Sequence, residues 1–392
     1  MEAFYKTHEY LLAHTDAAVR RNLMDEINWD DRLIGIKGTR GVGKTTFLIQ
    51  YAQEYHRQDR SCLYININNF YFQGRSLVDF AADFVKHGGK TLLVDQVFKM
   101  VDWSEQLRQC YERFPKLKIV FTGSSVMRLK EENAELNGIV TPYNLRGFSF
   151  REFLNLQTGH TFPCYSLDEI LLRHEAIARS VLSDVKPLDY FQDYLHHGFY
   201  PFFLEKRNFA ENLLKTMNMM IEVDILLIQK IEQKYLSKIK KLFYILATKG
   251  ASAPNVSSLA KETDLSRATV MNYIKYLADA RLVNLVYKPG DSFPKKPAKV
   301  MLHNPNLAFS IYPLSVSEKD VLESFLVNSL WKDHAVSKGE KEKTYIVDGA
   351  KQLNVCADKL PTRMEQETWH AVRKKELGHD HVVPLWLFGF LY

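Results

Sequence analysis

A glycine-rich stretch near the N-terminus constrains the fold of this chain more than any other feature. Gly38, Gly43, Lys44 and Thr45 satisfy the spacing GxxxxGK[ST] of the Walker A motif. Glycines at these positions let the backbone curl so that N–H groups point at phosphate oxygens, and the following helix directs the positive end of its dipole at them. The sequence therefore predicts a phosphate-binding loop of Gly38, Thr39, Arg40, Gly41, Val42, Gly43, Lys44, Thr45 and Thr46.

The residues on either side of this loop agree with that interpretation. An apolar run at 33–36 predicts a strand that enters the loop, and apolar residues at helical spacing over 45–55 predict a helix that leaves it. In such a loop the Lys44 amine would reach the β- and γ-phosphates of ATP, and the Thr45 hydroxyl would hold Mg²⁺. We therefore expect ATP and Mg²⁺ as cofactors.

Strands and helices alternate in the residues that follow. Strands are predicted at 62–67, 91–95 and 118–122, and helices between them at 76–86 and 103–114. This alternation implies right-handed crossovers and a parallel sheet that binds its ligand at the carboxyl ends of the strands. The predicted fold class of this part of the chain is therefore an α/β P-loop NTPase.

Asp95 closes an apolar strand and fits the Walker B position, where an aspartate orders the water-coordinated Mg²⁺ beside Thr45. ATPases of this type usually have a glutamate next, which polarises the attacking water, but this chain has Gln96. Because glutamine cannot accept the proton, we expect ATP binding with weak or absent hydrolysis. Either ATP serves as a structural ligand or slow switch, or a glutamate was exchanged here to trap the bound state. Ser124, just past the fourth strand, is expected to sense the γ-phosphate.

Composition is that of an ordinary globular protein. The chain has 392 residues, of which 46% are hydrophobic and 25% charged, and this length favours two to four domains. The most apolar run, residues 382–392, is about half of what a bilayer requires. The N-terminus carries no basic and apolar signal, so we expect a cytoplasmic protein with no membrane partner.

Positive charge is concentrated in the middle of the chain. Residues 231–300 contain thirteen lysines and arginines and five acids, a net charge of 13 − 5 = +8 against +6 for the whole chain. A local excess of this kind is what an anion-binding surface requires.

A helix-turn-helix pattern lies within this basic segment, at residues 256–277. Ser257 and Ser266 are candidate N-caps, and apolar residues of the second helix would face the core. Its outward residues are of types that contact phosphates and base edges, namely Arg267, Thr269, Asn272 and Lys275. Residues 282–287 and 299–302 would form a wing, so a winged helix is predicted. It would bind DNA through residues 256–302 or, alternatively, dock a protein partner.

The carboxyl-terminal residues resemble a restriction-endonuclease-like core, with a helix, then strands at 344–347 and 352–355. Glu323 and Asp348 fit two of the carboxylates that bind the catalytic metal of such a nuclease. The motif that should supply a second acid and a lysine reads Asn354-Val355-Cys356 instead. We therefore interpret this part as a small α/β nuclease-like scaffold that has lost its chemistry.

Nearly the whole chain resembles a family of bacterial and archaeal AAA+ ATPases in which a P-loop domain is fused to a carboxyl-terminal domain of unknown function. Besides the loop and Asp95, the resemblance rests on Phe121-Thr122-Gly123-Ser124-Ser125 and on residues 147–154, 198–202 and 304–307. It implies ATP binding and usually ATP hydrolysis. The family commonly has a Gly-Arg where this chain has Asn137-Gly138-Ile139, and loss of that arginine again favours feeble hydrolysis. Arg128 or Arg146 are the alternatives.

Together these patterns predict four parts: a P-loop AAA+ domain at 1–155, a helical lid at 156–230, a winged helix at 231–303 and a nuclease-like domain at 304–392. The predicted function is an ATP-binding AAA+ NTPase that couples nucleotide state to DNA or partner binding and is weak or inactive in hydrolysis. The alternative is a nucleotide-stabilised interaction scaffold without DNA binding. An active nuclease is a third class, and an oligomer is possible.

Overall fold

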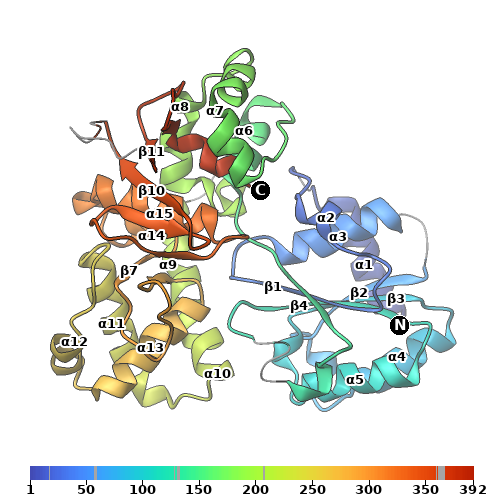
Figure 1. The fold of residues 1–392 in the computed structure, drawn as a ribbon. Helices are drawn as coiled ribbons and strands as arrows, with labels where there is room; N and C mark the ends of the chain where they lie inside the picture. The colour runs from blue at the N-terminus through green and yellow to red at the C-terminus, as the bar shows by residue number, and fades with distance from the viewer. Residues whose placement is uncertain are drawn as a thin grey trace. The chain divides into compact units, whose positions relative to one another are not determined.

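The computed structural model describes residues 1–16, 18–56, 60–127, 129, 133–205, 208–358, 360 and 367–392. The chain forms two compact units, Met1–Gly147 and Phe148–Tyr392 (Figure 1). The boundary therefore lies before the predicted one at 155. Helix α6 (Phe150–Thr158) spans residue 155, and its Phe150, Phe153 and Leu154 are buried in the core of the second unit, which is why the division falls earlier.

The first unit is a parallel sheet with helices on both faces. Its helices are α1 (Glu2–His14), α2 (Leu23–Glu26), α3 (Lys44–Tyr55), α4 (Leu77–Lys86) and α5 (Trp103–Arg113), and its strands are β1 (Leu33–Gly38), β2 (Cys62–Asn66), β3 (Thr91–Asp95), β4 (Lys118–Ser124) and β5 (Thr141–Asn144). The strand order is β2-β3-β4-β1-β5, and every pair is parallel. In Figure 1, α1 and α3 cover one face and α4 and α5 the other.

The four predicted strands of this unit are confirmed, and each contains a buried apolar run. All five residues of β3 are buried, as its continuous apolar sequence predicts for a central parallel strand. Strand β5 was not predicted, because it is a short edge strand that contains Pro142 and no fully buried residue. It pairs only with β1 and completes the sheet beside the glycine-rich loop.

The second unit combines helices with two further sheets. Its helices are α6, α7 (Leu167–Leu182), α8 (Pro187–Asp193), the π-helix η4 (Tyr194–Gly198), α9 (Phe209–Met219), the π-helix η6 (Met220–Ile225), α10 (Leu226–Ile228), α11 (Leu236–Thr248), α12 (Val256–Thr263), α13 (Arg267–Asp279), α14 (Pro305–Ile311), α15 (Glu318–Leu330) and the 3-10 helix η9 (Leu385–Phe390). Its strands are β6 (Val283–Val286), β7 (Lys299–Leu302), β8 (Val336–Lys338), β9 (Thr344–Val347), β10 (Lys351–Cys356), β11 (Thr368–Val372) and β12 (Val382–Pro384).

The larger sheet of this unit is mixed. Its order is β12-β11-β10-β9-β8, with antiparallel pairing from β8 to β10 and parallel pairing from β10 to β12. The predicted strands at 344–347 and 352–355 are confirmed, whereas β8, β11 and β12 were not predicted. These three have only three to five residues each, which is too short for a clear periodic pattern.

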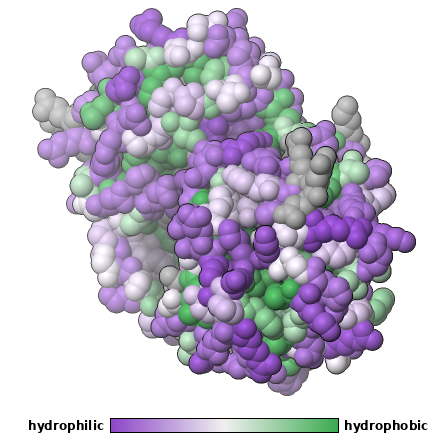
Figure 2. Space-filling view, turned by 90° about the vertical axis from the view of Figure 1, so that its right-hand side faces the viewer, coloured by the Kyte–Doolittle hydropathy of each residue, from purple (hydrophilic) through white to green (hydrophobic). Residues whose placement is uncertain are grey.

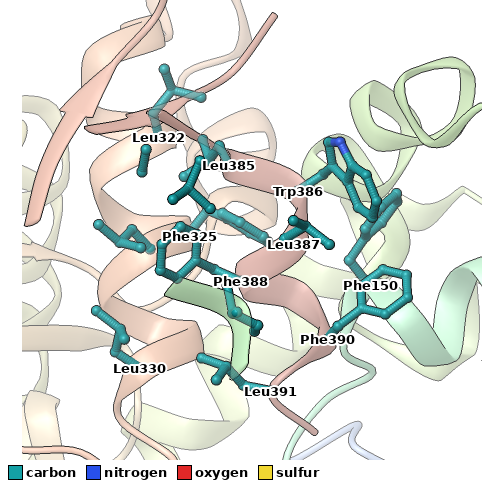
Figure 3. Close-up of a cluster of buried hydrophobic side chains, with 14 of the residues drawn as sticks. Phe150, Leu322, Phe325, Leu330, Leu385, Trp386, Leu387, Phe388, Phe390 and Leu391 are labelled. Atoms are coloured by element: carbon teal, nitrogen blue, oxygen red, sulfur yellow. The ribbon is translucent and has the colours of Figure 1, made fainter. Parts of the chain in front are cut away.

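One hydrophobic core joins residues far apart in the sequence of the second unit. Phe150 of α6, Phe325 of α15 and Trp386 of η9 are all fully buried in it (Figure 3). Residues of α7 and α8 belong to the same core. The helices predicted as a lid over the nucleotide are therefore packed with the carboxyl-terminal residues, and the assignment of a lid stays a prediction.

Residues 236–302 contain two consecutive short helices followed by two antiparallel strands. Helices α12 and α13 contact each other and α11, and β6 pairs with β7 in the smaller sheet. Ser266 caps α13 as predicted, because its side chain accepts a hydrogen bond from the Thr269 N–H. The prediction for Ser257 is wrong: Asn255 caps α12, and Ser257 lies inside that helix.

Hydrophilic side chains cover most of the face shown in Figure 2, between smaller hydrophobic patches. The exposed large apolar residues include Phe70 and Val101, which follow β2 and β3. Of the helices that the structure describes, none has the length and apolar character to cross a bilayer.

Candidate functional site

The glycine-rich loop joins β1 to α3 and requires its glycines. Gly41 and Gly43 have φ angles of 80° and 91°, in the left-handed region that disfavours side chains. A Cβ on Gly38 would lie 2.5 Å from the Leu145 carbonyl oxygen. Strand β1 is thus followed by a tightly curled backbone and then directly by a helix N-terminus, the arrangement that binds phosphate groups.

The Lys44 side chain folds back over this loop. Its Nζ donates to the carbonyl oxygens of Gly38 at 2.7 Å and Thr39 at 2.8 Å. The ammonium group is therefore held beside the curled backbone by two carbonyl oxygens, which are neutral acceptors.

Asp95 and Thr45 are brought together as the sequence predicts. Thr45 lies in the first turn of α3, and Asp95 is the last residue of β3. Thr45 Oγ1 donates a hydrogen bond to Asp95 Oδ2 at 2.7 Å. Asp95 is only 1% exposed. A hydroxyl and a carboxylate in contact at this position provide the oxygen donors that Mg²⁺ prefers, so the residues present fit the cation.

Hydroxyls of two further residues hold the Asp95 carboxylate, with a longer contact from Asn66 Nδ2 at 3.5 Å, and none of these was predicted from the sequence. Tyr64 of β2 donates its hydroxyl to Asp95 Oδ2 at 2.8 Å, and Thr122 of β4 donates to Oδ1. Burial and the Asp95 charge raise the pKa of Tyr64, so its hydroxyl stays protonated as a donor. In the sequence, Tyr64 and Thr122 are each a polar residue within a mostly apolar strand, and this feature could have indicated them.

Gln96 and Ser124 lie at the same edge of the sheet. Gln96 has a φ of 57°, and its N–H donates to Thr122 Oγ1 at 2.9 Å, so the backbone turns sharply directly after Asp95. Ser124 is opposite Gly38 in the β1–β4 register and is buried. Its position suits the predicted role, which stays a prediction.

The source of an arginine finger in this chain stays a prediction. Asn137-Gly138-Ile139 lies in the turn that precedes β5, and Gly138 has a φ of 79°. Arg128 lies outside the described residues. The Arg146 carbonyl accepts a hydrogen bond from Arg21 within the same unit, at 2.7 Å.

Sequence comparison agrees with this geometry. Residues 30–154 match the family model of an AAA domain. The first unit has the α/β fold of an AAA+ P-loop NTPase. Residues 188–302 match a second family, described as a domain of unknown function (DUF8612), which spans part of the predicted lid and the helix-turn-helix.

Two proteins of Methanocaldococcus jannaschii are similar to this chain. The uncharacterized protein MJ1637 is 26% identical over 283 residues, 68% of this chain and 59% of that protein. The uncharacterized protein MJ1544 is 24% identical over 269 residues, 64% of this chain and 55% of that protein. The matched part of this chain thus spans little more than half the length of either relative.

Among solved structures, the Aeropyrum pernix ORC1 protein in complex with DNA has a TM-score of 0.30 and 12% identity, covering 80% of this chain and 92% of that one. AMPPCP-bound DnaA from Aquifex aeolicus has a TM-score of 0.24 and 13% identity, covering 71% and 87%. Similarities this slight support no conclusion about the present chain.

The four residues predicted to contact nucleic acid differ in their exposure to solvent and in their side-chain partners. Arg267 and Asn272 are exposed on α13. Thr269 is half-buried and its hydroxyl lies 2.8 Å from that of the capping Ser266. Lys275 is paired with Asp279 one helical turn later. Thr269 and Lys275 thus have structural partners, and Arg267 and Asn272 present their side chains to solvent.

Ion pairs also account for much of the charge in this basic segment. All five acids of residues 231–300 pair with lysines of the same segment: Glu232, Glu262, Asp264, Asp279 and Asp291. Two further lysines pair with Glu222 and Glu323. The exposed basic residues left are Lys241, Lys261, Arg267, Lys288 and Lys296.

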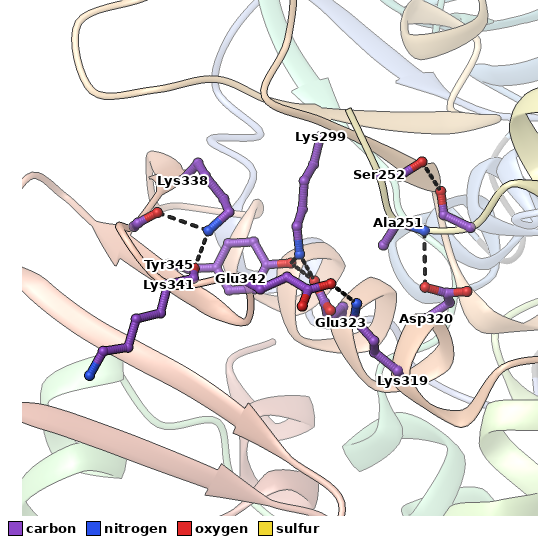
Figure 4. Close-up of polar contacts among 12 residues, drawn as sticks. Ala251, Ser252, Lys299, Lys319, Asp320, Glu323, Lys338, Lys341, Glu342 and Tyr345 are labelled. Carbon is purple, nitrogen blue, oxygen red and sulfur yellow. Dashed lines mark hydrogen bonds and ion pairs between the residues drawn. The ribbon is translucent and has the colours of Figure 1, made fainter. Parts of the chain in front are cut away.

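Glu323 and Asp348, which fit two carboxylates of a nuclease-like core, have separate partners in the structure. Glu323 is fully buried and is bound by Lys299 of β7 and the Tyr345 hydroxyl (Figure 4). Asp348 lies in the turn between β9 and β10, where it accepts from the Ala335 N–H at 2.9 Å and contacts His334 Nδ1 at 2.7 Å.

Asn354 of the supposed nuclease motif lies away from that turn. In the β9–β10 register Asn354 is opposite Thr344, at the end of β9 remote from Asp348. The nuclease-like interpretation of the fold stays a prediction, and its two candidate acids have structural roles.

Proposed function

We propose that this chain is an ATP-binding AAA+-type NTPase whose nucleotide state controls the binding of DNA through residues 231–303. The observation that carries the nucleotide site is the 2.7 Å hydrogen bond from Thr45 to the buried Asp95, beside the curled glycine loop. In the bound state Lys44 and the loop N–H groups would hold the phosphates, and Thr45 and Asp95 would hold Mg²⁺ directly and through its waters.

Hydrolysis is expected to be weak. Mg²⁺, when bound, neutralises developing charge on the phosphates. Gln96 directly follows Asp95 and can orient a water, but its amide cannot take the proton of that water. The side chains at this edge of the sheet thus favour holding ATP over turning it over.

Substitution of Lys44 tests the nucleotide site. Lys44→Ala removes a charge-assisted contact, so the affinity for ATP with Mg²⁺ should fall about tenfold to a hundredfold in a fluorescent-nucleotide titration. Lys86→Ala is the matched control, since Lys86 is an exposed lysine in the last turn of α4. Equal affinity of the Lys44 variant and the wild type would refute the proposal.

The role of Gln96 has its own test. Gln96→Glu restores a proton acceptor beside the attacking water, and ATP turnover should rise at least about tenfold if the ATPase is otherwise complete. Phosphate release at saturating ATP measures this. No rise would locate a second defect, for which the missing arginine at Ile139 is the first candidate.

Exposed positive charge supports DNA as the partner of the second unit. Arg267 lies in the first turn of α13, Lys261 in α12, and Lys288 and Lys296 between β6 and β7. Their exposure leaves them available for phosphate oxygens, whereas the pairing of Lys238, Lys249 and Lys275 lowers the contribution of those residues.

A salt titration of duplex DNA binding tests this part. Each phosphate contact contributes about −0.9 to the slope of log affinity against log salt, so Arg267→Ala with Lys261→Ala should make the slope shallower by nearly two. Lys275→Ala is the control, because its partner is Asp279. Undetectable DNA binding of the wild type at low salt would instead favour a nucleotide-stabilised protein scaffold.

A further inference from the structure

A buried arginine ties the phosphate-binding loop to the last residues of the first unit. Arg21 is 6% exposed and lies ahead of β1. One terminal nitrogen, Nη1, donates to the Val42 carbonyl at 3.1 Å. The other, Nη2, donates to the carbonyls of Arg146 at 2.7 Å and Gly147 at 3.2 Å. A single guanidinium group therefore spans from the loop to residues 146–147.

The loop and the exit of the first unit touch at a second place. The Leu145 N–H donates to the Lys37 carbonyl at 2.7 Å, and the Leu145 carbonyl occupies the space that a side chain on Gly38 would need. The segment 145–147 is thus fixed along the end of β1 and the loop by both main-chain and Arg21 contacts. These contacts connect the loop and the end of β1 directly to this segment.

The next residue is fixed within the second unit. The Phe148 N–H donates to the Phe199 carbonyl at 2.8 Å, and the Tyr194 hydroxyl donates to the Phe148 carbonyl at 2.9 Å. Tyr194 is the first residue of the π-helix η4 and Phe199 directly follows that helix, and Asn306 of α14 binds the Tyr194 and Leu195 carbonyls. Gly147 is thus hydrogen-bonded to Arg21 of the first unit, and the next residue, Phe148, is hydrogen-bonded to residues of the second unit.

We infer that Arg21 is a positioning residue that transmits the state of the phosphate-binding loop to the segment leading into the second unit. This inference rests on the proposed nucleotide binding. When phosphate binds, the peptide groups around Val42 reorient toward it, and Arg21 transfers that change to the carbonyls of Arg146 and Gly147. Arginine suits this role because its planar fork presents several donors from separate nitrogens in a fixed geometry, whereas a lysine has a single nitrogen on a flexible stem.

The test compares Arg21→Gln with Arg20→Gln in the full chain. Arg20 is the adjacent arginine, but it lies at the surface and pairs with Asp25 and Glu54. Two quantities are measured for each protein: the affinity for ATP with Mg²⁺, and the rate of trypsin cleavage after Arg146, identified by mass spectrometry, with and without ATP. Cleavage at this peptide reports local opening of the segment.

Wild type and Arg20→Gln should show a change of about fivefold or more in cleavage rate on adding saturating ATP, the usual size of coupling between sites. Arg21→Gln should still bind ATP but lose this change, and Arg21→Lys should retain only part of it. If Arg21→Gln folds poorly, Arg21→Lys takes its place in the test, provided that its melting profile shows a folded protein. A partial loss of the ATP-dependent change in cleavage rate in Arg21→Lys then supports the inference.

The outcomes separate the inference from the proposed function. If the wild type binds no ATP, the proposed function fails and the inference fails with it. If the wild type binds ATP and Arg21→Gln keeps the full nucleotide-dependent change in cleavage, Arg21 only fastens the fold and the inference alone is overturned.

Discussion

Asp95 of the first unit and Glu323 of the second are both buried carboxylates, and their partners differ. Asp95 of the first unit is bound by the hydroxyls of Thr45, Tyr64 and Thr122. None of these partners carries a positive charge. Glu323 of the second unit is bound by the Lys299 ammonium and the Tyr345 hydroxyl.

This difference separates a binding site from a structural contact. Hydroxyl groups orient a carboxylate without cancelling its charge, so Asp95 keeps the capacity to attract a cation. Lys299 cancels the charge of Glu323 inside the protein, and burial together with the Glu323 charge raises the pKa of Tyr345 far above its usual value, so that its hydroxyl remains a donor. A buried acid is thus best interpreted from its partners, and only Asp95 has those of a metal site.

Helix α15, which carries Glu323, has a second acid that binds a distant segment of the same unit. Asp320 accepts a hydrogen bond from the Ala251 N–H at 2.9 Å, and Gly250 beside it has a φ of 68°, with no room for a side chain against the Asp320 carboxylate (Figure 4). With the Lys299–Glu323 pair, two acids of one helix hold the residues before α12 and strand β7. Glu323 therefore connects parts of the second unit rather than serving catalysis.

The largest expected effect is on stability. Glu323→Gln keeps the shape of the side chain but leaves Lys299 as an uncompensated charge that is almost fully buried, so the free energy of unfolding should fall by about 3 to 5 kcal/mol. Urea denaturation of the second-unit transition measures this, with ATP affinity as a control that should not change. A loss below about 1 kcal/mol would mean that Lys299 finds another partner or water.

Replacing both charges should restore much of that loss. Lys299→Met combined with Glu323→Leu removes the ion pair without leaving either charge alone, so the double variant should be more stable than Glu323→Gln and within about 2 kcal/mol of the wild type. Denaturation of the two single variants and the double variant gives the coupling energy. Additive losses would contradict a direct pairing of these side chains.

The corresponding substitution at Asp95 should act mainly on the Mg²⁺-dependent affinity for ATP. Asp95→Asn removes the charge and keeps only one of the two acceptor oxygens, so the Mg²⁺-dependent gain in ATP affinity should shrink about tenfold or more, and stability should fall by about 1 to 3 kcal/mol for the hydroxyl that loses its acceptor. Nucleotide titrations with Mg²⁺ and with EDTA measure the difference. An unchanged Mg²⁺ dependence would show that Asp95 does not serve the metal.

Tyr64 should have a smaller effect on the same carboxylate. Tyr64→Phe removes one hydrogen bond to Asp95 and little else, for an expected loss of about 1 to 2 kcal/mol in stability. Phe80→Leu, a buried change elsewhere in the first unit, serves as the control for packing loss alone. If Tyr64 only fills space, its variant will behave like that control and leave the Mg²⁺ dependence of ATP binding intact.

The comparison of the two units also shows how much could be predicted from the sequence. Gly38, Lys44 and Thr45 were identified because a loop between a strand and a helix fixes their positions locally, and Asp95 because the strands of a parallel sheet have their carboxyl ends at one edge. Tyr64 and Thr122 were missed because an inward-facing polar residue in a strand has no spacing that marks it.

In the second unit the partners come from distant segments. Glu323 fits a carboxylate of a nuclease-like core in the sequence, which does not reveal that Lys299 pairs with it, and Lys275 is paired with Asp279 one turn away. The compact units divide at 147/148 rather than at 155 for a similar reason: Phe150 and Phe153 are buried in a core that includes η9, more than two hundred residues later. Local patterns predict elements, whereas pairing across the chain decides their roles.

The smallest expected effect concerns the other former nuclease candidate. Burial tends to raise the pKa of Asp348, but hydrogen bonds from His334 and the Ala335 N–H outweigh it and hold the pKa below the usual 3.8. The carboxylate thus stabilises the fold above about pH 4, and this contribution is lost as the pH falls through its folded-state pKa. Because Asp348 is half-exposed and has a φ of 51°, which asparagine also tolerates, Asp348→Asn should cost less than about 1 kcal/mol at neutral pH. Denaturation curves of the variant and the wild type should converge below about pH 3, and a gap that persists there would show that the asparagine changes the turn itself rather than its charge.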